Sequence, residues 1–469
     1  MAEMGRALGA TEENWTKATA MGTGIQVIGI ALKRNVETKH ITQAAREVME
    51  RHAILRSKIV ENSKGKLVYE LPTGSPTPSL EVFPWPSSVS KCSAVLTLPG
   101  DSGDLSLALN HIVKQELNTY FPNAASKFTG PTVVFQLHVY AEPSQPKTII
   151  VLRMVSGAID RPAASTVSQS FLTALNALVD GQQAELPEAP GKEEALPALE
   201  DLIPKGKSKG FFQKVGDTVG YVAAAGKFVL YPFHSGFSEA KISDFQSDIL
   251  SYTLGKDGTA ALMAACEKEK TTVSAALSAA FLKASAGADE LKGKKSHFSF
   301  TTVVDLRPHF DPQIAQNALG NYTGGLSQDE QVKADADFWE LARSVSAGTQ
   351  IELDKGRQFS ELSVMNMLFS QVLKRPSLTL KSSLRTALLS IFAKTFDARW
   401  KDTEKLQLAG TYGPFASMHG AGPCFCIGEA LLEGPELNLS VVFPTPVYAR
   451  DQMEGLANAA LQILNAATN

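Results

Sequence analysis

An unbroken apolar run at residues 149–152 (IIVL) limits the possible fold more than any other feature of this sequence. Such a run is typical of a strand that is buried on both faces of its sheet. A turn of small residues follows at 156–161, and apolar residues at helical spacing then predict a helix over 164–180, which Gly181 ends. A buried strand that leads through a short turn into a helix predicts an α/β fold, and sites often form at such turns.

Two parts separated by a proline-rich segment are expected along the chain. Residues 186–210 hold four prolines and change from acidic to lysine-rich, which predicts a linker or crossover between residues 1–185 and 211–469. Periodicity in the first part predicts a helix at 41–52 and strands at 57–60, 66–71, 133–140 and 148–155. In the second part it predicts strands at 246–254, 298–304 and 437–443, and helices at 258–268, 272–286, 335–353, 360–373, 382–396 and 450–467.

The composition is that of an ordinary globular protein. The chain has 469 residues, 44% hydrophobic and 20% charged, which is enough for more than one core. A formal net charge of -3 favours neither nucleic acid nor an anionic membrane as a partner. The four cysteines have no metal-binding or disulfide spacing, and neither a signal sequence nor a membrane span is recognisable. We therefore expect a cytoplasmic monomer without a metal.

The segment at residues 155–161 (VSGAIDR) is the most informative about function. It resembles the His-His-x-x-x-Asp-Gly signature of the chloramphenicol-acetyltransferase-like superfamily, which includes condensation domains, BAHD acyltransferases and polyketide-associated acyltransferases. Asp160 matches this signature, whereas Val155, Ser156 and Arg161 replace the two histidines and the glycine. Further segments of the superfamily follow the expected order, at residues 51–56 (RHAILR), 303–308 (VVDLRP), 319–322 (LGNY) and 410–413 (GTYG). The likeness covers nearly the whole chain and is nearer the condensation and polyketide-associated branch.

The resemblance implies two acetyltransferase-like halves, each a mixed sheet flanked by helices, with a tunnel between them. It implies transfer of an acyl group from a thioester to an alcohol or amine of a small molecule. Acyl-CoA is then a possible co-substrate, and no bound cofactor is expected. In this superfamily the aspartate is structural and pairs with an arginine, and these residues are Asp160 and Arg307 here. The candidate tunnel residues are Gly157, His309, Asn321, Thr411, Tyr412 and His419.

Ser156 occupies the position of the family's general base but cannot perform the same chemistry. An imidazole accepts a proton near neutral pH because its pKa is about 6.5, and a serine hydroxyl does not. Losing a general base typically costs about 10²–10⁴-fold in rate. Three functions therefore stay open. They are acyl transfer with Ser156 as an unusual catalytic residue, a lyase or cyclase reaction on the same scaffold, and small-molecule binding by a pseudoenzyme.

The same residues also have a purely structural interpretation. Small residues at 156–158 fit a tight exit from a strand. Asp160 could cap the following helix, although a cap four residues before position 164 fits loosely. The Gly-x-Ser-x-Gly elbow of the hydrolases is absent around Ser156, so a serine-hydrolase triad is not expected.

Overall fold

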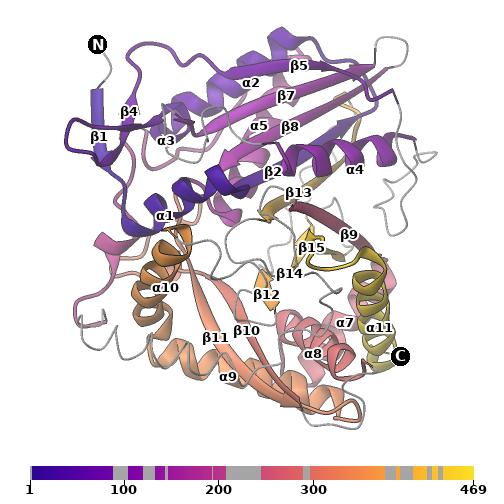
Figure 1. The fold of residues 1–469 in the computed structure, drawn as a ribbon. Helices are drawn as coiled ribbons and strands as arrows, with labels where there is room; N and C mark the ends of the chain where they lie inside the picture. Colours follow the sequence, from indigo (N-terminus) through magenta and orange to yellow (C-terminus); the bar gives the residue numbers. More distant parts are fainter. Residues whose placement is uncertain are drawn as a thin grey trace.

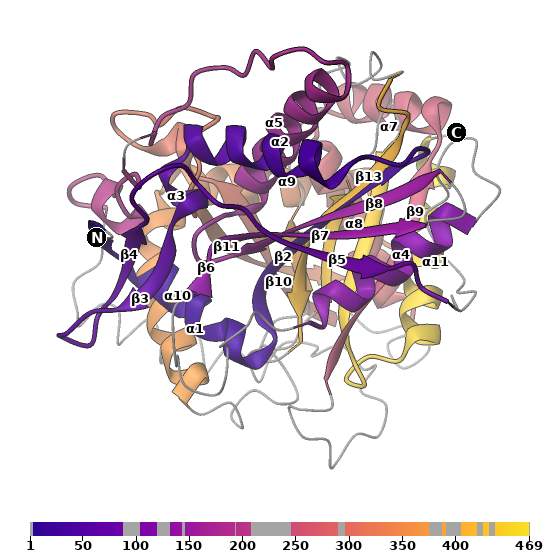
Figure 2. The same cartoon turned by 90° about the horizontal axis from the view of Figure 1, so that it is seen from above.

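Three β-sheets form the framework of the described chain in the computed structural model (Figure 1). The structure describes residues 3–87, 104–119, 132–142, 146–192, 194–207, 245–288, 296–374, 387–390, 405–419, 425–430 and 437–468. Helices flank the sheets, as Figure 2 shows from above. The expected α/β fold with mixed sheets is confirmed.

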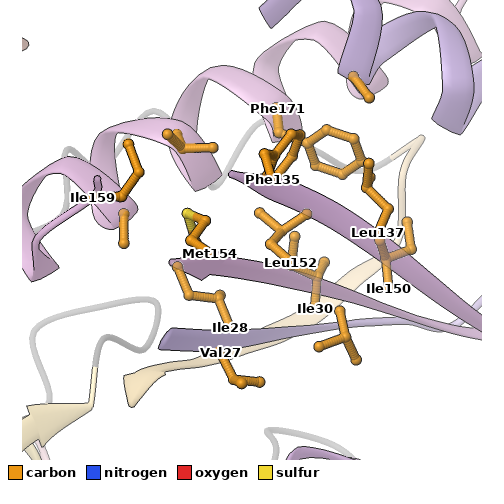
Figure 3. Packing of buried hydrophobic residues seen from close by; sticks show 14 of the residues in the cluster. Val27, Ile28, Ile30, Phe135, Leu137, Ile150, Leu152, Met154, Ile159 and Phe171 are labelled. Atoms are coloured by element: carbon orange, nitrogen blue, oxygen red, sulfur yellow. The ribbon is translucent and has the colours of Figure 1, made fainter. Parts of the chain in front are cut away.

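The first sheet has the strand order β13-β2-β8-β7-β5. Its strands are β2 (Thr23–Leu32), β5 (Ser79–Pro84), β7 (Phe135–Glu142), β8 (Lys147–Val155) and β13 (Leu408–Met418). Neighbouring strands are antiparallel except β5 and β7. Helices α2 (Thr38–Arg51) and α5 (Arg161–Val179) pack on one face, and α4 (Asp104–Leu117) lies against the other (Figure 2). Figure 3 shows Met154, Leu152 and Ile150 of β8 packed beneath α5.

The second sheet has the order β11-β10-β12-β14-β15-β9. Its strands are β9 (Gln246–Leu254), β10 (Ser296–Asp305), β11 (Thr323–Val332), β12 (Ala387–Ser390), β14 (Phe425–Ala430) and β15 (Leu437–Thr445). Strands β10, β12 and β14 run parallel, so their carboxyl ends lie at one edge. The accompanying helices are α7 (Lys256–Lys268), α8 (Val273–Ala286), α9 (Phe338–Asp354), α10 (Arg357–Lys374) and α11 (Arg450–Thr468).

A third, small sheet was not anticipated from the sequence. It has the order β1-β4-β3-β6, with β1 (Glu3–Ala7), β3 (Lys58–Glu61), β4 (Leu67–Leu71) and β6 (Thr132–Val133). The chain also has five further short helices among the described residues, namely α1 (Ala10–Ala18), η1 (Thr19–Met21), α3 (Ala53–Arg56), η2 (Leu199–Leu202) and η5 (Arg307–His309).

Most of the elements that the sequence predicts are present within a few residues of their expected bounds, and one is wrong. The helix expected at 382–396 is a strand at Ala387–Ser390, and the rest of that range lies outside the described residues. A short central strand buried on both sides has no alternation to distinguish it from a helix. The boundaries at 185 and 211 stay predictions. Strand β13 from the second part completes the first sheet beside β2.

A buried charged cluster joins α4 to the first sheet. Glu116 of α4 shares a 2.7 Å hydrogen bond with His138 Nδ1 and accepts one from the Tyr140 hydroxyl at 2.5 Å. Arg153 Nε of β8 lies 3.1 Å from Glu116 Oε2, and these two side chains are only 1% and 2% exposed. Charges buried this deeply are tolerated only when they are paired. The cluster therefore fixes α4 against β8, close to the end of that strand.

Replacing Glu116 by glutamine tests this cluster. Burial alone would raise the pKa of Glu116, but the His138 hydrogen bond and the Arg153 charge lower it below the usual 4.5. A carboxylate whose pKa falls on folding stabilises the fold above its unfolded pKa, and this contribution is lost as the pH falls through the folded pKa. We expect Glu116→Gln to cost about 3 kcal/mol of unfolding free energy at neutral pH. Urea unfolding should show that the difference in unfolding free energy between wild type and Glu116→Gln closes below about pH 4. A difference that stays constant there would show that the Glu116 carboxylate does not stabilise the fold.

Candidate functional site

The Asp160 carboxylate and the Arg307 guanidinium form a bidentate ion pair between the first and second sheets. Arg307 Nη1 lies 3.0 Å from Asp160 Oδ2, and Nη2 lies 3.0 Å from Oδ1. Asp160 follows β8 and Arg307 follows β10, so residues far apart in the sequence meet here. The two side chains are 2% and 0% exposed, which makes the pairing obligatory for both charges.

Every N–H group of the Arg307 guanidinium has an acceptor. Nε and Nη2 donate to the Ala318 carbonyl, at 3.1 and 3.0 Å, and Nη1 also donates to Asp305 at 2.9 Å. The guanidinium carbon lies 5.1 Å from the centre of the Tyr322 ring. Burial alone would lower the pKa of Arg307, but the charges of Asp160 and Asp305 outweigh it and raise the pKa. The arginine is therefore fixed as a cation in one position.

Asp160 holds the backbone as well as Arg307. Its Oδ1 accepts a 2.8 Å hydrogen bond from the backbone of Ala163, which makes Asp160 the N-cap of α5. Its Oδ2 accepts one of 2.8 Å from the backbone of Tyr322. The helix begins at Arg161, three residues earlier than the sequence predicts, and the capping interpretation therefore holds beside the ion pair.

Ser156 is held by its backbone, while its hydroxyl has no hydrogen-bond partner in the part of the chain that the structure describes. Its N–H donates to the Gly24 carbonyl at 2.8 Å, and its carbonyl accepts from Asn321 Nδ2 at 2.8 Å. The side chain is 7% exposed, and Oγ has no hydrogen-bond partner among the described residues. A buried hydroxyl without a partner is unusual in a folded protein. The turn thus holds a buried serine hydroxyl whose hydrogen-bonding capacity is unused by the described residues.

Gly157 is required by the close approach of α1. A Cβ at this position would collide with the Thr16 hydroxyl oxygen and lie 2.5 Å from the Glu12 carbonyl oxygen. Gly157 is therefore a packing residue in this structure. The Thr16 oxygen is itself buried without a hydrogen-bond partner in the described chain.

Gln26 is a residue of this region that the sequence analysis missed. Its Nε2 donates to the Ile159 carbonyl at 2.6 Å, whereas its Oε1 is buried and has no partner among the described residues. A glutamine within the apolar run of β2 was the available signal, because a buried amide needs partners. Gln26 thus supports the Ser156 turn from the neighbouring strand.

Two of the candidate tunnel residues, Tyr412 and His419, are buried and hydrogen-bonded. The Tyr412 hydroxyl bonds Ser251 of β9, and burial raises the tyrosine's pKa well above its usual value. His419 Nδ1 lies 2.8 Å from the Ser247 hydroxyl, and burial lowers the histidine's pKa to about 4. His419 is therefore neutral at pH 7. It lies beside the start of β2 on the side opposite Ser156, because β13 and β8 flank that strand.

The other candidates lie in different settings. Asn321 contacts Ser156 directly, as described above, and accepts a 3.2 Å hydrogen bond from Thr323. Thr411 is a buried residue of β13, in register with Ile30. His309 is half-buried at the end of η5. The expected tunnel stays a prediction. A cavity of about 920 Å³ between α2 and residues 183–192 does not include Ser156.

The site offers hydrogen bonding and orientation rather than metal or base chemistry from the side chains that the structure describes. These residues contain no group of three or more histidine, cysteine, aspartate or glutamate side chains that could hold a metal ion. Ser156 has no basic partner within the described ranges, because its hydroxyl forms no hydrogen bond there. A hydroxyl can donate to a developing oxyanion and accept from an N–H group.

Replacing Arg307 by alanine tests the ion pair. The change leaves the buried Asp160 carboxylate without its cation, and we expect a loss of about 3–5 kcal/mol in the free energy of unfolding. Arg343→Ala is a matched control, because Arg343 pairs with Glu269 at the surface, where its side chain is 46% exposed. That control should cost less than about 1 kcal/mol. Equal urea-unfolding midpoints for both variants would show that the Asp160–Arg307 pair does not hold the fold.

The comparisons with known proteins concern the fold and one part of the sequence. Residues 246–383 match the family model described as phthiocerol/phthiodiolone dimycocerosyl transferase C-terminus. No curated protein matches the chain. Polyketide synthase associated protein 5 from Mycobacterium tuberculosis is similar in structure, with 14% identity, a TM-score of 0.67 and coverage of 100% of this chain and 99% of that one.

Two parts of peptide synthetases are similar as well. The cyclization-docking bidomain of the EpoB synthetase from Sorangium cellulosum shares 12% identity and has a TM-score of 0.65. The match covers 99% of this chain and 85% of the bidomain. The starter condensation domain of rhizomide synthetase, a mutant solved with C8-CoA and Leu-SNAC, shares 12% identity at a TM-score of 0.61, with coverage of 99% and 94%. The resemblance drawn from the sequence is confirmed for the fold: the chain has the fold of a polyketide synthase associated protein and of peptide-synthetase condensation and cyclization domains.

Proposed function

We propose that this protein transfers an acyl group from a diffusible acyl-CoA to an amine or alcohol of a small molecule, with Ser156 as a hydrogen-bonding residue rather than a base. The observation that carries the proposal is the buried Ser156 hydroxyl, which has no partner among the described residues and lies on a turn whose backbone is fixed from both sides. The family match at residues 246–383 and the fold support acyltransferase-like activity in general. The acyl donor is suggested by the rhizomide synthetase domain, whose structure contains C8-CoA.

The reaction can proceed without a histidine when the acceptor is already nucleophilic. A neutral amine nitrogen attacks the thioester carbonyl carbon, and negative charge develops on the carbonyl oxygen. The C–S bond then breaks, and the thiolate leaves with the proton that the nitrogen gives up. In this sequence Ser156 donates a hydrogen bond to the carbonyl oxygen, which stabilises the charge, and binding supplies the orientation. An amine therefore suits this site better than an alcohol, whose proton has to be removed during attack.

Ser156→Ala is the first test of this proposal. Removing one donor to an oxyanion typically costs on the order of 10²–10³-fold in kcat, and we expect a loss of this size in acyl transfer. The measurement is CoA release from a panel of acyl-CoAs with amine and alcohol acceptors. Ser165→Ala is a matched control, since its hydroxyl donates to the Arg161 carbonyl of its own helix. Loss of activity in both variants, or in neither, would contradict the role of Ser156.

The same panel separates the two alternative functions. A product that forms without consumption of any thioester would favour a lyase or cyclase. Tight retention of a ligand from a cell extract with no turnover would favour a binding protein. Either result would replace acyl transfer as the function.

Ser156→His tests the absence of a base. If wild type uses no base at this position, its kcat with an alcohol acceptor should show no inflection near pH 6.5. The histidine variant should gain activity as the pH rises through about 6.5, because only the neutral imidazole accepts the proton. A wild-type profile that already has this inflection would reveal a base elsewhere in the protein, and Ser156 would then have another role.

A further inference from the structure

Helix α4 has an apolar face and a polar face. Leu109, Ile112 and Val113 on the apolar face are fully buried, and the helix packs with them against the first sheet. Residues at helical spacing on the other face are polar except for one leucine. Together with β9 and the start of α11 they line a pocket of about 420 Å³ (Figure 1), and they are Leu107, Asn110, His111, Lys114, Gln115 and Asn118.

The two walls of this pocket are joined by hydrogen bonds at one end. Asn118, directly after α4, donates from Nδ2 to the Ser247 carbonyl of β9 at 2.9 Å. Its Oδ1 accepts from the Ser247 N–H at 2.7 Å. Because one amide side chain satisfies both backbone groups of one residue, the end of α4 is held at a fixed distance from β9. The pocket is therefore a formed space with fixed walls, as small-molecule sites usually are.

Two cations from opposite walls meet at one carboxylate oxygen in the pocket. Asp248 Oδ1 of β9 lies 2.9 Å from Lys114 Nζ and 2.8 Å from Arg450 Nη1. The Asp248 side chain is 6% exposed, whereas those of Lys114 and Arg450 are 40% and 26% exposed. The negative charge thus lies beneath the surface, and the charge that these three side chains present to the pocket is positive.

The pocket has donors for more than this carboxylate. Asp248 is the one acid among the described residues that line it, and Glu454, 2.9 Å from Arg450 Nε, does not line it. A lysine ammonium has three N–H donors, and Asp248 takes one of those of Lys114. The side chain of His111 adds a ring N–H donor on the same helix face. Phosphate and carboxylate groups are the acceptors that lysine and arginine bind most strongly.

We propose that this pocket binds a small molecule through a phosphate or carboxylate group, with Lys114 and Arg450 as the charged contacts. A volume of about 420 Å³ lies within the range of small-molecule sites, roughly 300–1,000 Å³. Leu107 and Ile249 give the rest of such a ligand an apolar contact. The pocket does not include Ser156, so its binding of an anion is independent of the proposed acyl transfer.

Titration calorimetry of the whole protein with inorganic phosphate, pyrophosphate, acetate and succinate at constant ionic strength tests this site. The four probes distinguish phosphate from carboxylate, and one anionic group from two. Lys114→Gln removes the charge and keeps most of the length of the side chain. We expect its affinity for the preferred probe to fall by about tenfold or more, because a hydrogen bond to a charged group is lost. Lys355→Gln is the matched control and should bind like wild type, since Lys355 pairs with Glu352 on α9 and is 59% exposed.

A second variant keeps the charges and removes the space. Leu107→Trp puts a larger side chain into the pocket, and we expect it to weaken binding of the same probe although Lys114 and Arg450 are unchanged. Binding that this variant leaves as in wild type would place the anion on the surface and overturn the site. Equal losses in Lys114→Gln and Lys355→Gln, or a wild type that binds none of the probes, would also overturn it. If either pocket variant does not fold, the other decides.

Discussion

The buried ion pair between Asp160 and Arg307 is the interaction on which the rest of the site depends. Leaving either charge buried without the other would cost about 3–5 kcal/mol, a large share of a protein's net stability, so each residue requires the other. Asp160 also caps α5 and accepts from the backbone of Tyr322, while Arg307 binds the Ala318 carbonyl. One carboxylate thus fixes a helix start, the loop after β10 and the turn that carries Ser156. The acid of this motif has a structural role that the local geometry fully explains.

Residues from both sheets hold Ser156 in its position. Gly24 at β2 and Asn321 after β10 bind its backbone, and Gly157 allows α1 to pack against the next residue. The hydroxyl is the part of Ser156 that these contacts leave without a partner among the described residues. A rigid backbone with a free donor is what stabilisation of a developing charge requires, because nothing has to reorganise during the reaction. The missing histidine changes the chemistry that the site can perform more than it changes the framework.

The sequence was sufficient for the main features of the framework but not for its details. Asp160 and Arg307 could be paired before any coordinates, because the resemblance to the superfamily implies this pair and a buried carboxylate needs a cation. The start of α5 was placed three residues late, since the apolar positions that define a helix begin inside it and its cap is polar. Strand β12 was mistaken for a helix because buried residues on both faces erase the alternation of a strand. Gln26 and the contact from Arg161 to Ser390 join residues that are distant in sequence, and local patterns carry no information on them.

A crystal structure of the protein with a non-hydrolysable thioether analogue of a short acyl-CoA would test the central claim most directly. The account predicts a polar atom of the ligand's acyl end within about 2.6–3.2 Å of Ser156 Oγ, the range of a hydrogen bond. It also predicts that the Asp160–Arg307 pair is unchanged. A ligand bound away from Ser156, or a Ser156 hydroxyl that bonds a protein side chain in the complex, would contradict the account.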